Sequence, residues 1–180
     1  MKRKLWTLLL ALGAALALCV GASAANGTKL ETLHGGQTLS SGEYYLDGDV
    51  KISQTITVSG TVTLDLNGHV LKYENDQTRG GPLAVESGGH LTIKDSASNA
   101  THKFKPNGDG LWVLDETNGT ETVYGGVITG GTGYPIQFGS GAYGYTAYYG
   151  GAVYIEPGGT LNMGGGSIVG CSAVYGGGVC

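Results

Sequence analysis

The apolar and polar positions of the chain alternate in short runs that are separated by glycine corners. In residues 150–170, three such runs are centred near Tyr154, Asn162 and Ile168. A period of two residues is typical of a strand with one buried face. The glycine pairs and triplets between the runs supply the backbone freedom that a sharp corner needs. The stretch therefore predicts one coil of a β-solenoid, with three strands and three corners.

The pattern restarts after about 26 residues, and a fixed short period is the signature of stacked coils. Residues 146–153 are echoed by residues 172–179, and an earlier copy of the coil covers residues 54–79. We expect equivalent residues to lie above one another in the stack. The expected contacts are Val62 over Leu161, Leu64 over Ile93 and Met163, Val70 over Ile168, and Val58 in line with Val85 and with either Val153 or Ile155.

A copy between these two is longer, because it contains two surplus segments. Residues 80–93 align with residues 150–163, and residues 124–130 align with residues 164–170. The surplus segments flank the third strand of this coil. We therefore divide the chain into a signal peptide at 1–25, an N-terminal capping segment at 26–53, coils at 54–79, 80–149 and 150–175, insertions at 94–123 and 131–145, and the start of a truncated coil at 176–180.

The composition fits one all-β domain. The chain has 35 Gly and 4 Pro among 180 residues. Collagen would need glycine at every third position, and a disordered chain would lack the apolar alternation. Helical periodicity is absent after residue 25. We expect a β-solenoid with three strands in each coil, preceded by a signal helix.

Residues 1–25 have the organisation of a secretory signal peptide. Residues 2–4 are basic, residues 5–20 are apolar, and Ala22-Ser23-Ala24 is a cleavage site of small residues. We therefore expect a secreted or cell-surface protein. After cleavage, seven of the 10 Lys and Arg residues remain against 14 Asp and Glu, a net charge of −7. Nucleic acid is not expected as a partner, and neither is insertion of the mature chain into a membrane.

Cysteine and histidine indicate no metal or redox site. Cys171 and Cys180 remain after cleavage, and either a disulfide or two free thiols would fit an exported protein. The four histidines are scattered without the spacing of metal ligands, and we interpret them as ordinary surface residues. We expect no cofactor and no metal.

Function is expected in the two insertions, because loops vary on a regular solenoid scaffold. The first insertion is predicted to be a side hairpin, and the second is rich in glycine and aromatic residues. Aromatic faces with acids nearby suit sugar stacking and protein recognition, but such rings could equally cover the apolar side of the coil. We expect the insertions to form two walls of a shallow groove. Its candidate ligand-binding residues are Trp112, Tyr134, Phe138, Tyr143, Tyr145, Tyr148, Tyr149, Asp109, Asp115 and Glu116.

A resemblance to a known family is carried by the Gly-Gly-Ala-Val units, by residues 158–168 and by residues 62–69. Over residues 43–180 the chain is similar to the pectin-lyase-like repeats of bacterial secreted and surface adhesin-like proteins. The resemblance implies a right-handed parallel β-helix. It also implies a role as an adhesin or structural stalk, with a glycan or a host surface protein as partner.

A polysaccharide lyase or glycoside hydrolase is the alternative, because this fold is best known for those activities. Glycoside hydrolysis needs paired carboxylates, and a lyase typically needs a cation or basic residue together with a base. Arg79 is the only arginine of the mature chain, the motifs of polygalacturonases are absent, and the outward acids Asp65 and Asp95 are not clustered. We therefore expect no enzymatic activity. Two carboxylates within about 5 to 10 Å on one face would reverse that expectation.

The chain stops at the start of a further coil, so we expect a fragment of a longer protein. An uncapped last coil presents unpaired strand edges, which leaves self-association open.

Overall fold

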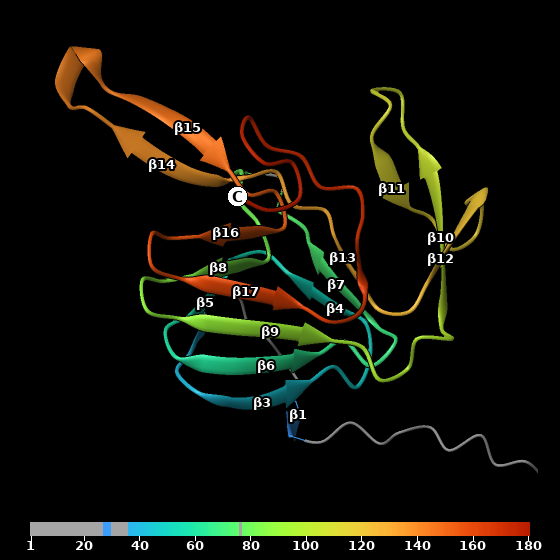
Figure 1. Cartoon of the computed structure of the whole chain (residues 1–180). Coiled ribbons are helices and arrows are strands. Elements are labelled where there is room, and N and C mark those ends of the chain that lie inside the picture. Colours follow the sequence, from blue (N-terminus) through green and yellow to red (C-terminus); the bar gives the residue numbers. More distant parts are fainter. Residues whose placement is uncertain (1–26, 30–35, 76) are drawn as a thin grey trace, which may run out of the picture.

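The structure, a computed structural model, describes residues 27–29, 36–75 and 77–180 (Figure 1). Within these residues the chain is all-β, with three parallel sheets, two antiparallel ribbons and one short 3-10 helix. The signal peptide expected at 1–25 lies outside the described residues, as do residues 26 and 30–35 of the expected capping segment.

Each regular coil contributes one strand to each of the three parallel sheets. The first sheet contains β1 (Thr28–Lys29), β3 (Gly42–Tyr45), β6 (Thr61–Asp65), β9 (His90–Lys94) and β17 (Thr160–Met163). The second sheet contains β2 (Thr38–Leu39), β5 (Ile56–Val58), β8 (Leu83–Val85) and β16 (Val153–Ile155). The third sheet contains β4 (Val50–Ile52), β7 (Val70–Tyr73), β13 (Val127–Thr129) and β18 (Ser167–Ile168).

The chain passes through the sheets in a fixed rotation, from the second sheet to the first and then to the third. Strands β2, β3 and β4 make one passage, and the following passages are β5, β6 and β7, then β8, β9 and β13, then β16, β17 and β18. In Figure 1 the strands of each sheet lie one above another. The segment 26–53, which the sequence predicts to be a cap, supplies a strand to each of the three parallel sheets, and its β1 lies at the edge of the first sheet.

Strand register places equivalent residues above one another. The inward rows of the first sheet are Val62, Leu91 and Leu161, and Leu64, Ile93 and Met163. In the second sheet Val85 lies between Val58 and Ile155. Of the two expected partners, Val153 and Ile155, the structure therefore has Ile155 in this row. The bridge between Val153 and Val179 confirms that the pattern restarts near the end of the chain.

The third sheet corrects one expected pair. Val70 pairs with Val127 and, through it, aligns with Ser167. Ile168 instead aligns with Leu71. The register expected for Val70 is therefore wrong by one residue. Val70 and Leu71 are adjacent, and both are buried, so the sheet is covered on both of its faces.

Two apolar clusters account for this double burial. The inner cluster combines buried side chains from all three sheets, and its members from β7 and β13 are Leu71, Tyr73 and Ile128. The outer cluster consists of Val70, Val127 and Phe104. Phe104 is fully buried and comes from the first insertion. The insertion therefore packs against the outer face of the third sheet.

Each insertion forms an antiparallel ribbon. The first, here called the side sheet, contains β10 (Thr101–Pro106), β11 (Trp112–Leu114) and β12 (Glu121–Tyr124), with β10 in the middle. The second, here called the aromatic hairpin, contains β14 (Tyr134–Phe138), the 3-10 helix η1 (Gly141–Tyr143) and β15 (Tyr145–Tyr149). Figure 1 shows the two ribbons leaving the stack on opposite sides.

Candidate functional site

The structure divides the predicted site residues between two places. Trp112, Asp109, Asp115 and Glu116 belong to the side sheet and its loops, whereas the predicted tyrosines and Phe138 belong to the aromatic hairpin. The side sheet and the hairpin lie on opposite sides of the stack in Figure 1. Within the described residues the side sheet and the aromatic hairpin are therefore not two walls of one groove, although Gly131 and Thr132 at the start of the second insertion line a cavity together with residues 111–114 of the first.

The aromatic hairpin gathers four rings on one of its faces. Tyr134 lies opposite Tyr149, and Phe138 lies opposite Tyr145. Residues that are opposite or two apart in a ribbon point to the same side. The rings of Phe138 and Tyr145 stack with centroids 5.3 Å apart and an interplanar angle of 17°.

The inner rings of the hairpin are anchored on the stack. Tyr134 stacks on Tyr154 of β16, with centroids 4.8 Å apart and ring planes within 3°. Tyr149 stacks on Tyr175, also at 4.8 Å. Aromatic pairs contribute about 0.5–1.5 kcal/mol beyond the burial of their area. Burial raises the pKa of the phenols of Tyr149 and Tyr154. For Tyr134 and Tyr149 this geometry supports a packing role.

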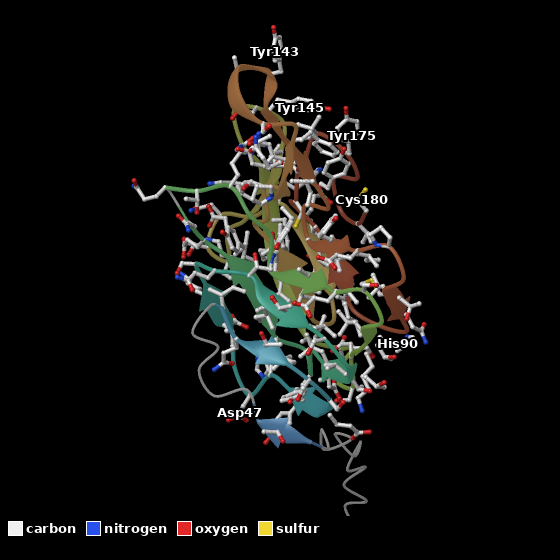
Figure 2. The ribbon with its side chains drawn as sticks, turned by 90° about the vertical axis from the view of Figure 1, so that its left-hand side faces the viewer. Asp47, His90, Tyr143, Tyr145, Tyr175 and Cys180 are labelled. Carbon is white, nitrogen blue, oxygen red and sulfur yellow. The ribbon has the colours of Figure 1, made fainter. Side chains whose placement is uncertain are left out.

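The outer part of the hairpin is exposed. Tyr143 and Tyr145 are 93% and 62% exposed, and Figure 2 shows Tyr143 at the far end of the hairpin with Tyr145 below it. Tyr148 lies on the opposite face of the ribbon, where the Arg79 guanidinium carbon is 4.2 Å from the centre of its ring. Residues 134–149 contain no charged side chain. The hairpin thus presents an uncharged, aromatic surface.

The side sheet is attached to the stack by His102. Its Nε2 lies 2.9 Å from the carbonyl oxygen of Gly68, and its Nδ1 lies 2.9 Å from Oε1 of Glu116. The other carboxylate oxygen of Glu116 accepts the backbone N–H of Lys103. His102 is 7% exposed. The interpretation of His102 as an ordinary surface residue is therefore wrong.

Two of the predicted acids are engaged within the side sheet. Glu116 holds His102, and Asp115 forms an ion pair with Lys105. Asp115 also accepts the backbone N–H groups of Thr117 and Asn118. The Lys105 ammonium, followed by these backbone donors, lowers the pKa of Asp115 to about 2. Both carboxylates thus organise the loop after β11.

Asp65 supports a corner of the first coil. Its Oδ1 accepts the backbone N–H groups of Asn67 and Ser96. Asp65 alternates with Leu64 and Leu66 of the inner cluster and so points outward, as expected. It is nevertheless only 1% exposed, because the start of the first insertion covers it. Its Oδ2 has no hydrogen-bond partner among the described residues and lies 3.9 Å from Nζ of Lys94. Asn67, which Asp65 holds, has a positive φ of 48°.

Asp95 supports the same corner from the next coil. Its two carboxylate oxygens accept the backbone N–H groups of Gly68 and Gly126. Asp65 and Asp95 therefore meet at one corner, although they are not clustered in the sequence. Carboxylates that accept backbone N–H groups at a corner have a structural role, whereas a glycosidase pair must face the substrate.

A cavity of about 270 Å³ lies between the side sheet and the outer face of the third sheet. Its lining includes Trp112, Thr129, Lys72 and Glu74. Gly170 lies at its edge with a φ of +65°, and a Cβ there would collide with the backbone oxygen of Trp112. Sequence analysis selected Trp112 but missed the other residues, because Lys72 and Glu74 only mark the outward face of a strand and Thr129 is an ordinary strand residue.

Neither a membrane span nor a metal cluster is found in the part of the chain that the structure describes. No helix there is long and apolar enough to cross a membrane. No three His, Cys, Asp or Glu side chains gather there in a way that could hold a metal ion. Comparisons with protein-family models, with curated proteins and with solved structures found no match for this chain.

Proposed function

We propose that the three parallel sheets close into a right-handed parallel β-helix with coils of about 26 residues. The rotation through the sheets occurs four times in the described residues. Each return to a sheet is a crossover between parallel strands, and such crossovers are right-handed in about 98% of cases. The inner cluster, with side chains from all three sheets, supports this closure.

We infer that this β-helix is the scaffold of an exported module, an adhesin or structural stalk that is secreted or held at the cell surface. The signal-peptide pattern of residues 1–25, the acidic mature chain and the resemblance to adhesin-like repeats support this role. A stack of parallel coils suits a stalk, because each coil contacts only its neighbours and the assembly extends in one direction.

The aromatic hairpin is the recognition surface of this module, and its projecting uncharged rings carry the proposal. Tyrosine offers a large contact area with few rotatable bonds, and interfaces between proteins are enriched in it. The Tyr, Gly and Ser residues of 134–149 match the composition that serves antibody paratopes. A sugar site would add charged or amide groups for the hydroxyls, and Gln137 is the one amide side chain in this segment. The partner is therefore a protein surface.

The test measures binding of the fluorescently labelled mature chain, residues 26–180, to cultured epithelial cells. We expect saturable binding that is lost when the cells are treated with trypsin and is kept when their glycans are oxidised with periodate. The double variant Tyr143→Ser, Tyr145→Ser removes two exposed rings and should weaken binding about tenfold or more. Tyr124→Ser removes an exposed ring of the side sheet, 67% exposed, and is the matched control.

Loss of binding after periodate but not after trypsin would assign the hairpin to glycans instead. Absence of binding by the parent chain would contradict the recognition role, and so would equal binding by the double variant and by the control. In either case the hairpin would serve packing alone.

A further inference from the structure

The cavity beside the third sheet combines an aromatic wall with polar groups that lack partners. Thr129 is 2% exposed and lies at the end of β13, on the same outer face as Val127. No described residue forms a hydrogen bond with its hydroxyl. The hydroxyl is not among the fully buried unpaired atoms of the described residues, and Thr129 lines the cavity, so the hydroxyl is open to the cavity and can bond to a ligand there.

The aromatic wall of the cavity is Trp112. Its side chain is 39% exposed, and its indole N–H has no hydrogen-bond partner among the described residues. Leu111 and Leu114 extend the apolar part of the lining. An indole with a free N–H offers a flat apolar face and one donor at its edge.

The charged groups of the lining neutralise each other. Lys72 Nζ lies 2.9 Å from Oε1 of Glu74, and Nζ of Lys51, 68% exposed, lies 3.3 Å from Oε2. The Lys72 ammonium lowers the pKa of the Glu74 carboxyl. Lys72 donates one N–H to Glu74. Its other two N–H groups and the carboxylate acceptors of Glu74 match neighbouring hydroxyls of one ligand.

We propose that this cavity binds a single neutral sugar residue in its pyranose form. A pyranose ring stacks one face on an indole, and its hydroxyls would pair with Thr129 and with the Lys72–Glu74 pair. A volume of about 270 Å³ is just below the range of drug-sized ligand sites, about 300–1,000 Å³, which suits one ring. An apolar ligand would leave the Thr129 hydroxyl and the indole N–H unpaired. An anion would have to compete with Glu74 for Lys72.

This inference is independent of the proposed role of the aromatic hairpin. The hairpin rings are not part of the cavity lining in the described residues. Binding to a protein partner could fail while sugar binding holds, and the reverse is equally true. A module with both sites would engage a glycoprotein surface at two points.

The mature chain offers a direct spectroscopic test. The sequence has 2 tryptophans, Trp6 and Trp112, so Trp112 is the only one in residues 26–180. The chain is titrated with methyl glycosides of glucose, galactose, mannose, N-acetylglucosamine and N-acetylgalactosamine, and tryptophan emission is recorded. At least one glycoside should change the emission saturably, with a dissociation constant in the range of about 0.1–10 mM.

Two Thr→Val variants distinguish the site from the bulk surface. Thr129→Val keeps the shape of the side chain and removes the hydroxyl, and should weaken sugar binding about tenfold. Thr92→Val makes the same change on the outward face of β9 and should bind as the parent does. If Thr129→Val does not fold, as judged by circular dichroism, Lys72→Gln is the second variant and should also weaken binding.

Three outcomes would overturn the proposal. In the first, no glycoside of the panel changes the emission saturably. In the second, Thr129→Val folds and binds as tightly as Thr92→Val. In the third outcome uridine or benzoate, added as non-sugar ring compounds, binds more tightly than every glycoside, and the cavity is then a general aromatic site.

Discussion

At the scale of single residues, His102 shows how one polar side chain fixes an inserted ribbon. The imidazole lies between two acceptors, a backbone carbonyl of the corner at Gly68 and the carboxylate of Glu116. The contact with the Gly68 carbonyl is buried, whereas the contact with Glu116 is partly open to water, because the Glu116 side chain is 47% exposed. Buried polar groups are favourable only when they are paired. The corner and the side sheet therefore depend on the same ring.

Replacing that ring should destabilise the protein measurably. His102→Leu introduces an apolar side chain of similar size and leaves the Gly68 carbonyl without a donor. The free energy of unfolding should therefore fall by about 1–3 kcal/mol. Urea unfolding followed by circular dichroism measures the change. His90→Leu is the control, because His90 is exposed and bonded to Thr160 at the surface, and it should change stability by about 0.5 kcal/mol or less. Equal effects of the two variants would argue against the anchoring role.

The two cysteines of the mature chain should differ in reactivity. In the described residues neither is in a disulfide. Burial raises the pKa of the Cys171 thiol to about 11, against weaker opposing bonds from Gly131 and Gly130, whereas Cys180 is exposed. At pH 8, below that pKa, about one Cys171 in a thousand is the reactive thiolate. With Ellman's reagent we expect one fast and one slow phase, and Cys180→Ser should remove the fast one. A single phase in the parent chain would contradict this assignment.

At the scale of elements, the side sheet acts as a lid on the third sheet. Alternation along β7 assigns only one of the neighbours Val70 and Leu71 to a core, yet both are buried. The difference is the outer cluster, in which Phe104 of β10 covers Val70 and Val127. The aromatic hairpin has a looser relation to the stack, since Phe138 remains 36% exposed.

The 2 phenylalanines of the chain provide a matched comparison of the two ribbons. Phe104→Ala empties a fully buried site, so the free energy of unfolding should fall by about 3–5 kcal/mol. Phe138→Ala loses mainly its stacking on Tyr145 and should reduce stability by about 1 kcal/mol. Thermal and urea unfolding measure both changes. A larger loss for Phe138→Ala would show that the hairpin, and not the side sheet, is integral to the core.

The elements could be predicted from the sequence wherever one local pattern decided them. The period of two residues and the glycine corners predicted the strands that contain Leu64, Ile93 and Met163 and their order in the stack. The alignment of the repeats also located both insertions. The direction in which each insertion leaves the stack has no such signal, because it depends on corner geometry. The burial of Val70 and of Asp65 could not be predicted for the same reason, since residues distant in sequence cover them.

At the scale of the whole molecule, stability is shared between neighbouring coils. Each parallel strand of the two middle coils, β5 to β9 and β13, pairs with a strand above it and a strand below it, so one coil in the middle of the stack supports both neighbours. Strand β9 holds such a position in the first sheet, between β6 and β17. A disruption there should spread to the coils on both sides, whereas a change on the outward face of the same strand leaves the stack intact.

Two adjacent residues of β9, one inward and one outward, test whether stability is shared between the coils in this way. Ile93 is fully buried between Leu64 and Met163, and Ile93→Asp would place an unpaired charge in the inner cluster. The expected loss exceeds about 4 kcal/mol, which approaches the total stability of a typical domain, about 5–15 kcal/mol. Thr92→Asp adds the same charge on the outward face and should lower stability by about 1 kcal/mol or less. Circular dichroism should therefore show a folded Thr92→Asp and a largely unfolded Ile93→Asp. An unchanged thermal midpoint in Ile93→Asp would mean that the side chain of residue 93 does not point into the stack, and the register of the first sheet would have to be revised.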